Sequence, residues 1–141
     1  MPATLRRLTA ALALAGLAAA AQLPAIAQPA TEADIEAAGA RRLDGMDFSK
    51  LYVGNTLSGT AADGKGFHVF VESMSRYRML YDGKRTADHR SVGKDGTFCA
   101  TAGAETTCTR EWLHNGVVHS FNEDGTLAGT ARIHIGNPRK L

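Results

Sequence analysis

Five Asx-Gly dipeptides occur in the chain after residue 55 and constrain its fold more than any other feature. They are Asp63-Gly64, Asp82-Gly83, Asp95-Gly96, Asn115-Gly116 and Asp124-Gly125. Each pair accepts the positive φ angles of a tight hairpin turn, and short apolar or β-branched runs separate the pairs. The chain is therefore expected to fold as an antiparallel meander.

The runs between these turns predict about eight strands. Their expected bounds are Thr56–Thr60, Phe67–Glu72, Tyr77–Tyr81, Arg85–Val92, Thr97–Thr101, Thr107–Leu113, Val117–Phe121 and Leu127–Ile135. This number suits a mainly all-β chain folded as a small antiparallel up-and-down β-barrel, lipocalin-like in architecture. Such a barrel is nearly filled by side chains or holds one small ligand, and its closure removes exposed edge strands. An open sheet is the alternative.

Alternating apolar residues support the strand assignment. Three sets of apolar side chains recur at every second position: Phe67, Val69 and Val71; Tyr77, Met79 and Tyr81; and Ile133 with Ile135. A period of two places the members of each set on one face of a strand. We expect these faces to point into the core.

The first 27 residues have the composition of an export signal. Arg6 and Arg7 precede an apolar run from Leu8 to Ala21, and Ala25-Ile26-Ala27 fits the small-x-small cleavage pattern. The apolar run is short for a membrane span, and a polar segment follows it. We expect cleavage after Ala27, a periplasmic protein and no stable membrane anchor.

Cleavage would leave 114 residues, a common size for one domain. We expect an N-terminal helical lead or linker over 28–46 and the β-domain over 47–141. Thr31 and Asp34 mark a helix start, and helix-forming residues continue to Arg42. Asp47 is the expected cap of a second short helical turn, which Gly54 would end.

The expected mature chain has no net formal charge. Two of the sixteen basic side chains, Arg6 and Arg7, belong to the signal, which leaves fourteen basic against fourteen acidic residues. Nucleic acid is therefore not an expected partner, because its binding depends on neutralising phosphates with positive charge. We expect a monomer.

The two cysteines, Cys99 and Cys108, lie in neighbouring predicted strands on either side of a polar loop. In an oxidising compartment they have one possible pairing, and cross-strand positions bring the Cα atoms close enough for a disulfide. A redox-active pair is the alternative, but the Cys-x-x-Cys spacing typical of one is missing. We expect a structural disulfide.

No local motif predicts catalysis. The sequence has no Gly-x-Ser-x-Gly elbow and no evident pair of facing carboxylates, so we expect a protein that is not an enzyme and has no cofactor. The histidines lack the spacing of a metal or haem site. His119 is the candidate ligand should a site be assembled across strands, because its period-two relation to Val117 and Phe121 places it inside. The others expected to face solvent are His68, His89 and His134.

The segment from Arg76 to Arg90 is basic and contains two tyrosines. The candidates for contact with a ligand or partner are Ser73, Ser75, Arg76, Tyr77, Arg78 and Tyr81. Such a segment suits an acidic partner, an anionic lipid or a polyanionic sugar. The alternative is a solvated hairpin whose arginines cover the barrel wall.

Two resemblances follow from these segments. Leu-Tyr-Val-Gly-Asn-Thr at 51–56, Gly-Thr-Phe-Cys at 96–99 and a second cysteine at 108 resemble small exported disulfide-containing proteins of uncharacterised function from alphaproteobacteria. That resemblance implies a compact β domain and no particular activity. Ser-Met-Ser-Arg-Tyr at 73–77 is similar to a strand of the periplasmic inhibitors of c-type lysozyme, which implies contact with a lysozyme cleft.

Three functional hypotheses remain. The first is a non-enzymatic periplasmic binding module for a small apolar or amphipathic ligand, or for another envelope protein. The second is an inhibitor of a cell-wall hydrolase that acts through Ser73, Ser75 and Tyr77. The third is a metal or haem carrier that uses His119 with other histidines.

Overall fold

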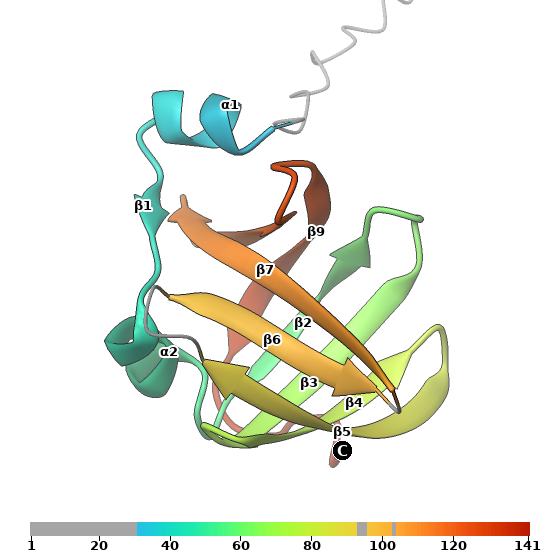
Figure 1. Ribbon diagram of the computed structural model, residues 1–141. Helices are drawn as coiled ribbons and strands as arrows, with labels where there is room; N and C mark the ends of the chain where they lie inside the picture. The colour runs from blue at the N-terminus through green and yellow to red at the C-terminus, as the bar shows by residue number, and fades with distance from the viewer. Residues whose placement is uncertain (1–30, 93–95, 103) are drawn as a thin grey trace, which may run out of the picture.

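The computed structural model describes residues 31–92, 96–102 and 104–141, which form a mainly β chain with two short helices (Figure 1). The helices are α1 (Glu32–Ala37) and α2 (Gly45–Leu51). The strands are β1 (Arg41–Arg42), β2 (Thr56–Ala61), β3 (Gly66–Ser73), β4 (Arg76–Tyr81), β5 (Lys84–Val92), β6 (Thr97–Ala102), β7 (Glu105–His114), β8 (Val117–Asn122) and β9 (Leu127–His134). The predicted signal peptide, Met1 to Ala27, lies outside the described residues.

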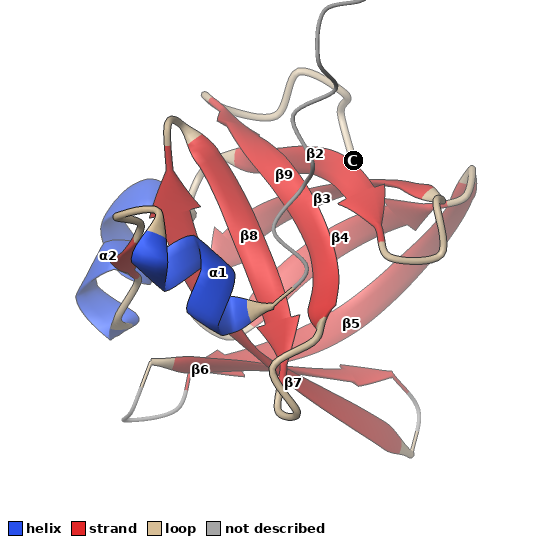
Figure 2. Cartoon of the chain, turned by 90° about the horizontal axis from the view of Figure 1, so that it is seen from above, coloured by secondary structure: helices blue, strands red, loops and turns tan. Residues whose placement is uncertain are grey.

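The strands form one antiparallel sheet in the order β1-β7-β6-β5-β4-β3-β2-β9-β8, and β7 also pairs with β8. The sheet is strongly curved (Figure 2). Eight of its strands lie within two residues of the predicted bounds, so the expected antiparallel meander is confirmed. The ninth, β1, was not predicted as a strand and pairs with Leu113 and Trp112 of β7.

Four of the five Asx-Gly pairs make the predicted turns, and Asp95 of the fifth pair lies outside the described residues. Between β4 and β5, Asp82 and Gly83 have φ angles of 48° and 76°; between β7 and β8, Asn115 and Gly116 have 49° and 74°. Two consecutive positive φ angles define the turn whose twist matches the twist of antiparallel strands. These two hairpins therefore follow directly from their dipeptides.

An apolar cluster fills part of the space inside the curved sheet, and α2 packs at one end of it (Figure 1). The Phe48 ring of α2 stacks on Phe98 of β6 with ring centroids 4.7 Å apart. Tyr52, directly after α2, packs edge-on against Phe48 at 4.9 Å. As predicted for their strands, Val69 and Val71 belong to this cluster.

The start of α2 differs from the prediction. Asp44, and not Asp47, is the N-cap, and its side chain accepts hydrogen bonds from the backbone of Met46 and Asp47. Asp47 lies three positions later, where it bonds back to the Asp44 backbone and pairs with Arg41 at 2.5 Å. This reciprocal capping box fixes the helix start one turn earlier than expected. The chain then turns at Gly54 with the predicted positive φ, 81°.

The N-terminal segment packs on the outer face of the sheet, where α1 lies beside β8 (Figure 2). Thr31 and Asp34 form the predicted capping box, and Ile35 packs against Trp112 and Phe121. The predicted continuation of the helix to Arg42 is wrong. The helix ends at Ala37, and Gly39, with a φ of 84°, turns the chain into β1.

At the end of β9 the alternation also stops earlier than predicted. Ile133 packs against the interior cluster, whereas Ile135 is 93% exposed. The strand ends at His134, and Gly136 donates a backbone hydrogen bond to the Asn55 side chain as the chain turns away. The prediction that Ile135 belongs to the core is therefore wrong.

Candidate functional site

A cavity of about 450 Å³ lies on the inner side of the curved sheet. Large apolar side chains from four strands line much of it: Leu57, Phe67, Val69, Met79 and Phe98. Small residues of β6 and β9 complete the apolar lining: Ala100, Ala128, Gly129 and Ala131. These residues are brought together by pairings between distant strands, and the sequence contains no local motif for the cavity.

Phe98 separates the cavity from α2. Its ring borders the cavity on one side and stacks on Phe48 on the other. Phe48 and Tyr52 have no exposed surface, so the interior next to α2 is filled by side chains. The helix thus closes one end of the interior, and the space remains beyond Phe98.

A buried carboxylate, Glu111 of β7, lies in the cavity wall with only 2% of its surface exposed. It accepts a short hydrogen bond from the Tyr52 hydroxyl and one of 3.4 Å from the Ser120 hydroxyl. Sequence reasoning assigned none of these three residues to a binding site. Glu111 is two positions from the interior residue Leu113, so the period of two in β7 was a signal that could have found it.

The six predicted contact residues do not gather on one surface. Tyr81 lines the cavity and its hydroxyl donates to Asp63 at 2.8 Å. Tyr77 is 4% exposed in the interior cluster, so it is not part of any outer contact surface. Of the remaining four, Arg76 and Ser75 are exposed and Ser73 is half-buried. Arg78 forms an ion pair with Glu72 at 2.5 Å.

Alternation along β4 explains this division, because successive side chains point to opposite faces of the sheet. Tyr77 and Tyr81 point inward, whereas Arg76 and Arg78 point outward. The inhibitor hypothesis required Ser73, Ser75 and Tyr77 to share one surface. The burial of Tyr77 leaves that hypothesis without its aromatic contact.

The basic segment lies against the C-terminal residues on the outer face. Arg78 donates to the Leu141 backbone oxygen at 3.0 Å, and Arg85 lies 3.5 Å from that of Lys140. The side chain of Arg90 is outside the described part of the chain. These contacts favour the interpretation in which arginines cover the outer wall.

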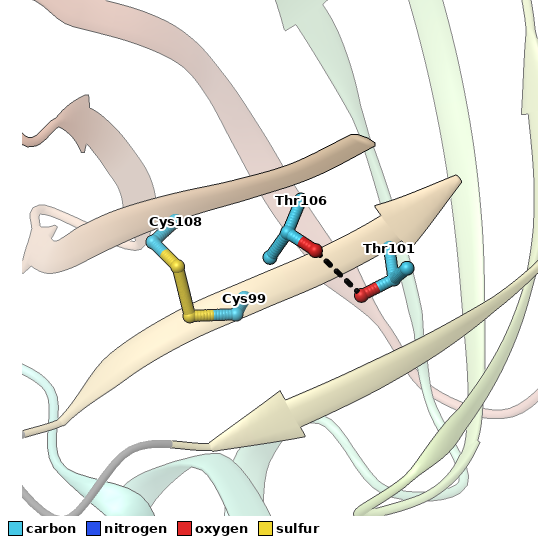
Figure 3. Close-up of a disulfide and its surroundings, with 4 residues drawn as sticks. All are labelled: Cys99, Thr101, Thr106 and Cys108. Atoms are coloured by element: carbon cyan, nitrogen blue, oxygen red, sulfur yellow. Dashed lines mark hydrogen bonds between the residues drawn. A yellow bond between two sulfur atoms is a disulfide. The ribbon is translucent and has the colours of Figure 1, made fainter. Parts of the chain in front are cut away.

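The predicted disulfide between Cys99 and Cys108 is confirmed (Figure 3). The two residues are directly opposite each other in β6 and β7, with Cα atoms 4.0 Å apart. Two residue pairs further along the same strands, Thr101 and Thr106 are hydrogen-bonded at 3.1 Å. A crosslink that closes so short a loop contributes about 2–3 kcal/mol through the entropy of the unfolded chain.

His119 is buried, with 7% exposure, but on the outer face of the sheet. It is directly opposite Trp112, which packs against Ile35 of α1 on that face. Its Nδ1 has no hydrogen-bond partner among the described residues. The prediction that His119 is buried is therefore confirmed, but the prediction that it points to the inner face of the sheet is wrong.

No metal site is evident around this histidine. Within 31–92, 96–102 and 104–141, no three His, Cys, Asp or Glu side chains lie close enough to hold a metal ion. Of the histidines predicted to face solvent, His134 is exposed and His68 is half-buried, with its Nδ1 2.8 Å from the Ser58 hydroxyl. The His89 side chain lies outside the described residues.

Burial of His119 makes stability depend on pH. Burial, and then the neighbouring His114, lower the pKa of His119 below its ordinary 6.5. As the pH falls below about 6.5, the unfolded chain takes up a proton that the folded chain still excludes, so the free energy of unfolding decreases. His119→Leu is expected to flatten this decrease in urea denaturation between pH 7.5 and 5, apart from the part due to His68, whose pKa burial also lowers.

The exposed His134 provides the matched control. His134→Leu should change the pH dependence less than His119→Leu does, through the part that His134 contributes to the lowered pKa of His68. An unchanged pH profile in His119→Leu would show that His119 is accessible to protons in the folded protein, contrary to its burial.

Neither helix in the described segments has the length and apolar character needed to cross a bilayer. Comparisons of the chain with models of protein families, with curated proteins and with solved structures found no match. A proposal for the function therefore rests on the cavity and its lining residues.

Proposed function

We propose that the protein is an exported, non-enzymatic binding module that holds a small apolar or amphipathic ligand inside a small β-barrel. The observation that carries this proposal is the cavity of about 450 Å³ on the inner side of the sheet. Small-molecule sites are typically concave, mostly apolar spaces of about 300–1,000 Å³ with a few polar groups. This cavity combines an apolar lining with Glu111, Ser120 and two threonines.

The pairing pattern supports a barrel. Each of β2 to β9 pairs with at least two other strands, and β7 pairs with β8 as well as with β6 and β1. An interior enclosed in this way keeps a ligand away from water and leaves few strand edges exposed. Because the apolar residues of β3 and β4 point inward, the same alternation that stabilises the fold also creates the lining.

We propose that the protein is exported to the periplasm. The arginines, apolar run and cleavage pattern of the first 27 residues indicate a signal peptide. The disulfide agrees with an oxidising compartment, because such crosslinks are rare in the cytosol. An envelope protein as a further docking partner remains a prediction.

Blocking the cavity tests the binding function. N-phenyl-1-naphthylamine, a neutral dye that fluoresces in apolar sites, should bind the wild-type protein saturably, near one molecule per chain. Ala100→Phe places a ring where a small residue lines the cavity and should weaken dye binding at least tenfold. The measurement is a fluorescence titration on protein whose fold is checked by circular dichroism.

The neighbouring residue on β6 supplies the matched control. Thr101 is exposed on the opposite face, so Thr101→Phe adds the same ring outside the cavity and should leave dye binding unchanged. Ala128→Leu blocks the cavity from β9 should Ala100→Phe fail to fold. Equal dye binding by wild type and a folded cavity variant would overturn the proposed function.

A further inference from the structure

The outer face of the sheet over β9, β2, β3, β4 and β5 carries two rows of outward-pointing residues. Between these rows lies one row of register partners that pack in the interior, namely Ile133, Leu57, Val69 and Met79. Side chains on either side of an inward row point outward. The two flanking rows are His134, Thr56, Phe70 and Arg78, and Arg132, Ser58, His68, Leu80 and Arg85. Neither row contains an acidic residue.

The chain after β9 crosses this face and adds two further cations (Figure 2). Its far end lies over β4, where Arg78 donates to the Leu141 backbone oxygen at 3.0 Å. The Asn137 side chain bonds to the Leu141 backbone at 2.9 and 3.1 Å, and Leu141 is only 4% exposed. Arg139 and Lys140, between these two residues, are exposed. The segment is therefore fixed on the sheet while its charged side chains point to solvent.

Strands and segment together form a basic face. We define it by its exposed cations: Arg76, Arg78, Arg85, Arg132, Arg139 and Lys140. Among the described residues its one acid is Glu72, which pairs with Arg78 at 2.5 Å and with Arg76 at 3.9 Å. The remainder of the expected mature chain has eight basic and thirteen acidic residues. A chain with no net charge thus carries one strongly positive face.

An exposed isoleucine lies at the edge of the basic face. Ile135 is 93% exposed, compared with 66% for Met46 and 38% for Met74. It directly follows β9, between Arg132 and Arg139 in the chain. Single exposed apolar residues are common on protein surfaces. One placed among cations, however, matches an interface in which anionic head groups cover hydrocarbon.

We propose that the basic face docks the protein reversibly on a membrane surface that contains anionic phospholipids, with Ile135 entering between the head groups. Lysine and arginine side chains within a Debye length of a negative leaflet are attracted to it. A polyanionic sugar would match the cations but offers no apolar phase for the isoleucine. Docking of this kind is peripheral, and it is independent of ligand binding because the cavity lies on the inner side of the sheet.

Co-sedimentation with vesicles tests this proposal on the exported, disulfide-bonded protein. The protein should bind vesicles made from equal amounts of phosphatidylglycerol and phosphatidylcholine, but not vesicles of phosphatidylcholine alone. Binding should weaken about tenfold or more as sodium chloride rises to about 0.5 M, where the Debye length falls to about 4 Å. Absence of binding to the anionic vesicles at low salt overturns the proposal.

A pair of double variants locates the charged contact. Arg139→Gln with Lys140→Gln should weaken vesicle binding about tenfold, because each removed cation loses its attraction to the leaflet. Lys50→Gln with Lys65→Gln removes the same charge from exposed positions outside the basic face and should weaken binding less than about threefold. Equal losses in the two double variants would mean that only net charge matters, which overturns the assignment to this face.

A pair of single variants tests the apolar contact. Ile135→Ser should weaken vesicle binding about fivefold or more, because the side chain no longer gains from leaving water. Met46→Ser truncates an exposed apolar residue on α2 and should leave binding unchanged. If Ile135→Ser binds like wild type and dextran sulfate displaces the vesicles, the partner is a polyanion and the lipid proposal is wrong. Titration of these variants with N-phenyl-1-naphthylamine without vesicles tests the cavity separately, so failure of either proposal leaves the other measurable.

Discussion

Phe98→Ala is expected to lower the free energy of unfolding by about 3–5 kcal/mol, the usual effect of removing a buried phenyl ring. Phe98 is almost fully buried and touches both elements that close the interior, α2 and the sheet. Its ring centroid is 4.7 Å from that of Phe48 and 6.0 Å from that of Tyr52. Because Phe98 also borders the cavity, its truncation joins new empty space to an existing one, and the surrounding side chains cannot easily fill it.

Urea denaturation followed by circular dichroism measures this effect, with Met46→Ala as the control. Met46 lies in α2 but is 66% exposed, so its truncation should change the free energy of unfolding by no more than about 0.5 kcal/mol. A loss of less than about 1 kcal/mol for Phe98→Ala would mean that the ring does not join α2 to the sheet. The assignment of α2 as the closed end of the interior would then be wrong.

The features that could be predicted from the sequence depend on short-range signals. Asn115 and Gly116 specify a turn by their own φ preferences, and the bounds of β7 and β8 follow from that turn. The disulfide could be predicted because Cys99 and Cys108 flank one hairpin loop in a sequence with no other cysteine. Such signals need no knowledge of distant strands.

The candidate site depends on long-range contacts, and for that reason sequence reasoning missed most of it. Tyr52 and Glu111 are 59 residues apart and meet only because α2 packs against one end of the curved sheet. Nothing local in the sequence singles out Glu111, whose two neighbours Arg110 and Trp112 point outward toward Glu32 of α1. The burial of His119 on the outer face likewise depends on a distant segment, because α1 packs on that face.

Gly59→Ala is expected to destabilise the protein by more than about 3 kcal/mol, because β2 and β9 approach too closely for a side chain there. A Cβ atom at Gly59 would lie 1.9 Å from the Thr130 backbone oxygen and 2.7 Å from the Ala131 Cα. Both contacts are with backbone, so rotation of a side chain cannot relieve them. Strand-interior glycines of this kind mark tight bends of a sheet, and Gly129 on β9 is similar, with a Cβ position 2.8 Å from the Thr60 oxygen.

Gly66 provides the matched comparison, because it also lies in a strand but a Cβ atom there would have no neighbour closer than 3.9 Å. The free energy of unfolding of Gly66→Ala should therefore lie within about 0.5 kcal/mol of the wild-type value in the same urea titration. Equal stability of the two alanine variants would show that β2 and β9 lie further apart than this structure places them. Since Gly129 and Ala131 line the cavity, a wider spacing would also change its shape, so this pair of variants tests the wall on which ligand binding depends.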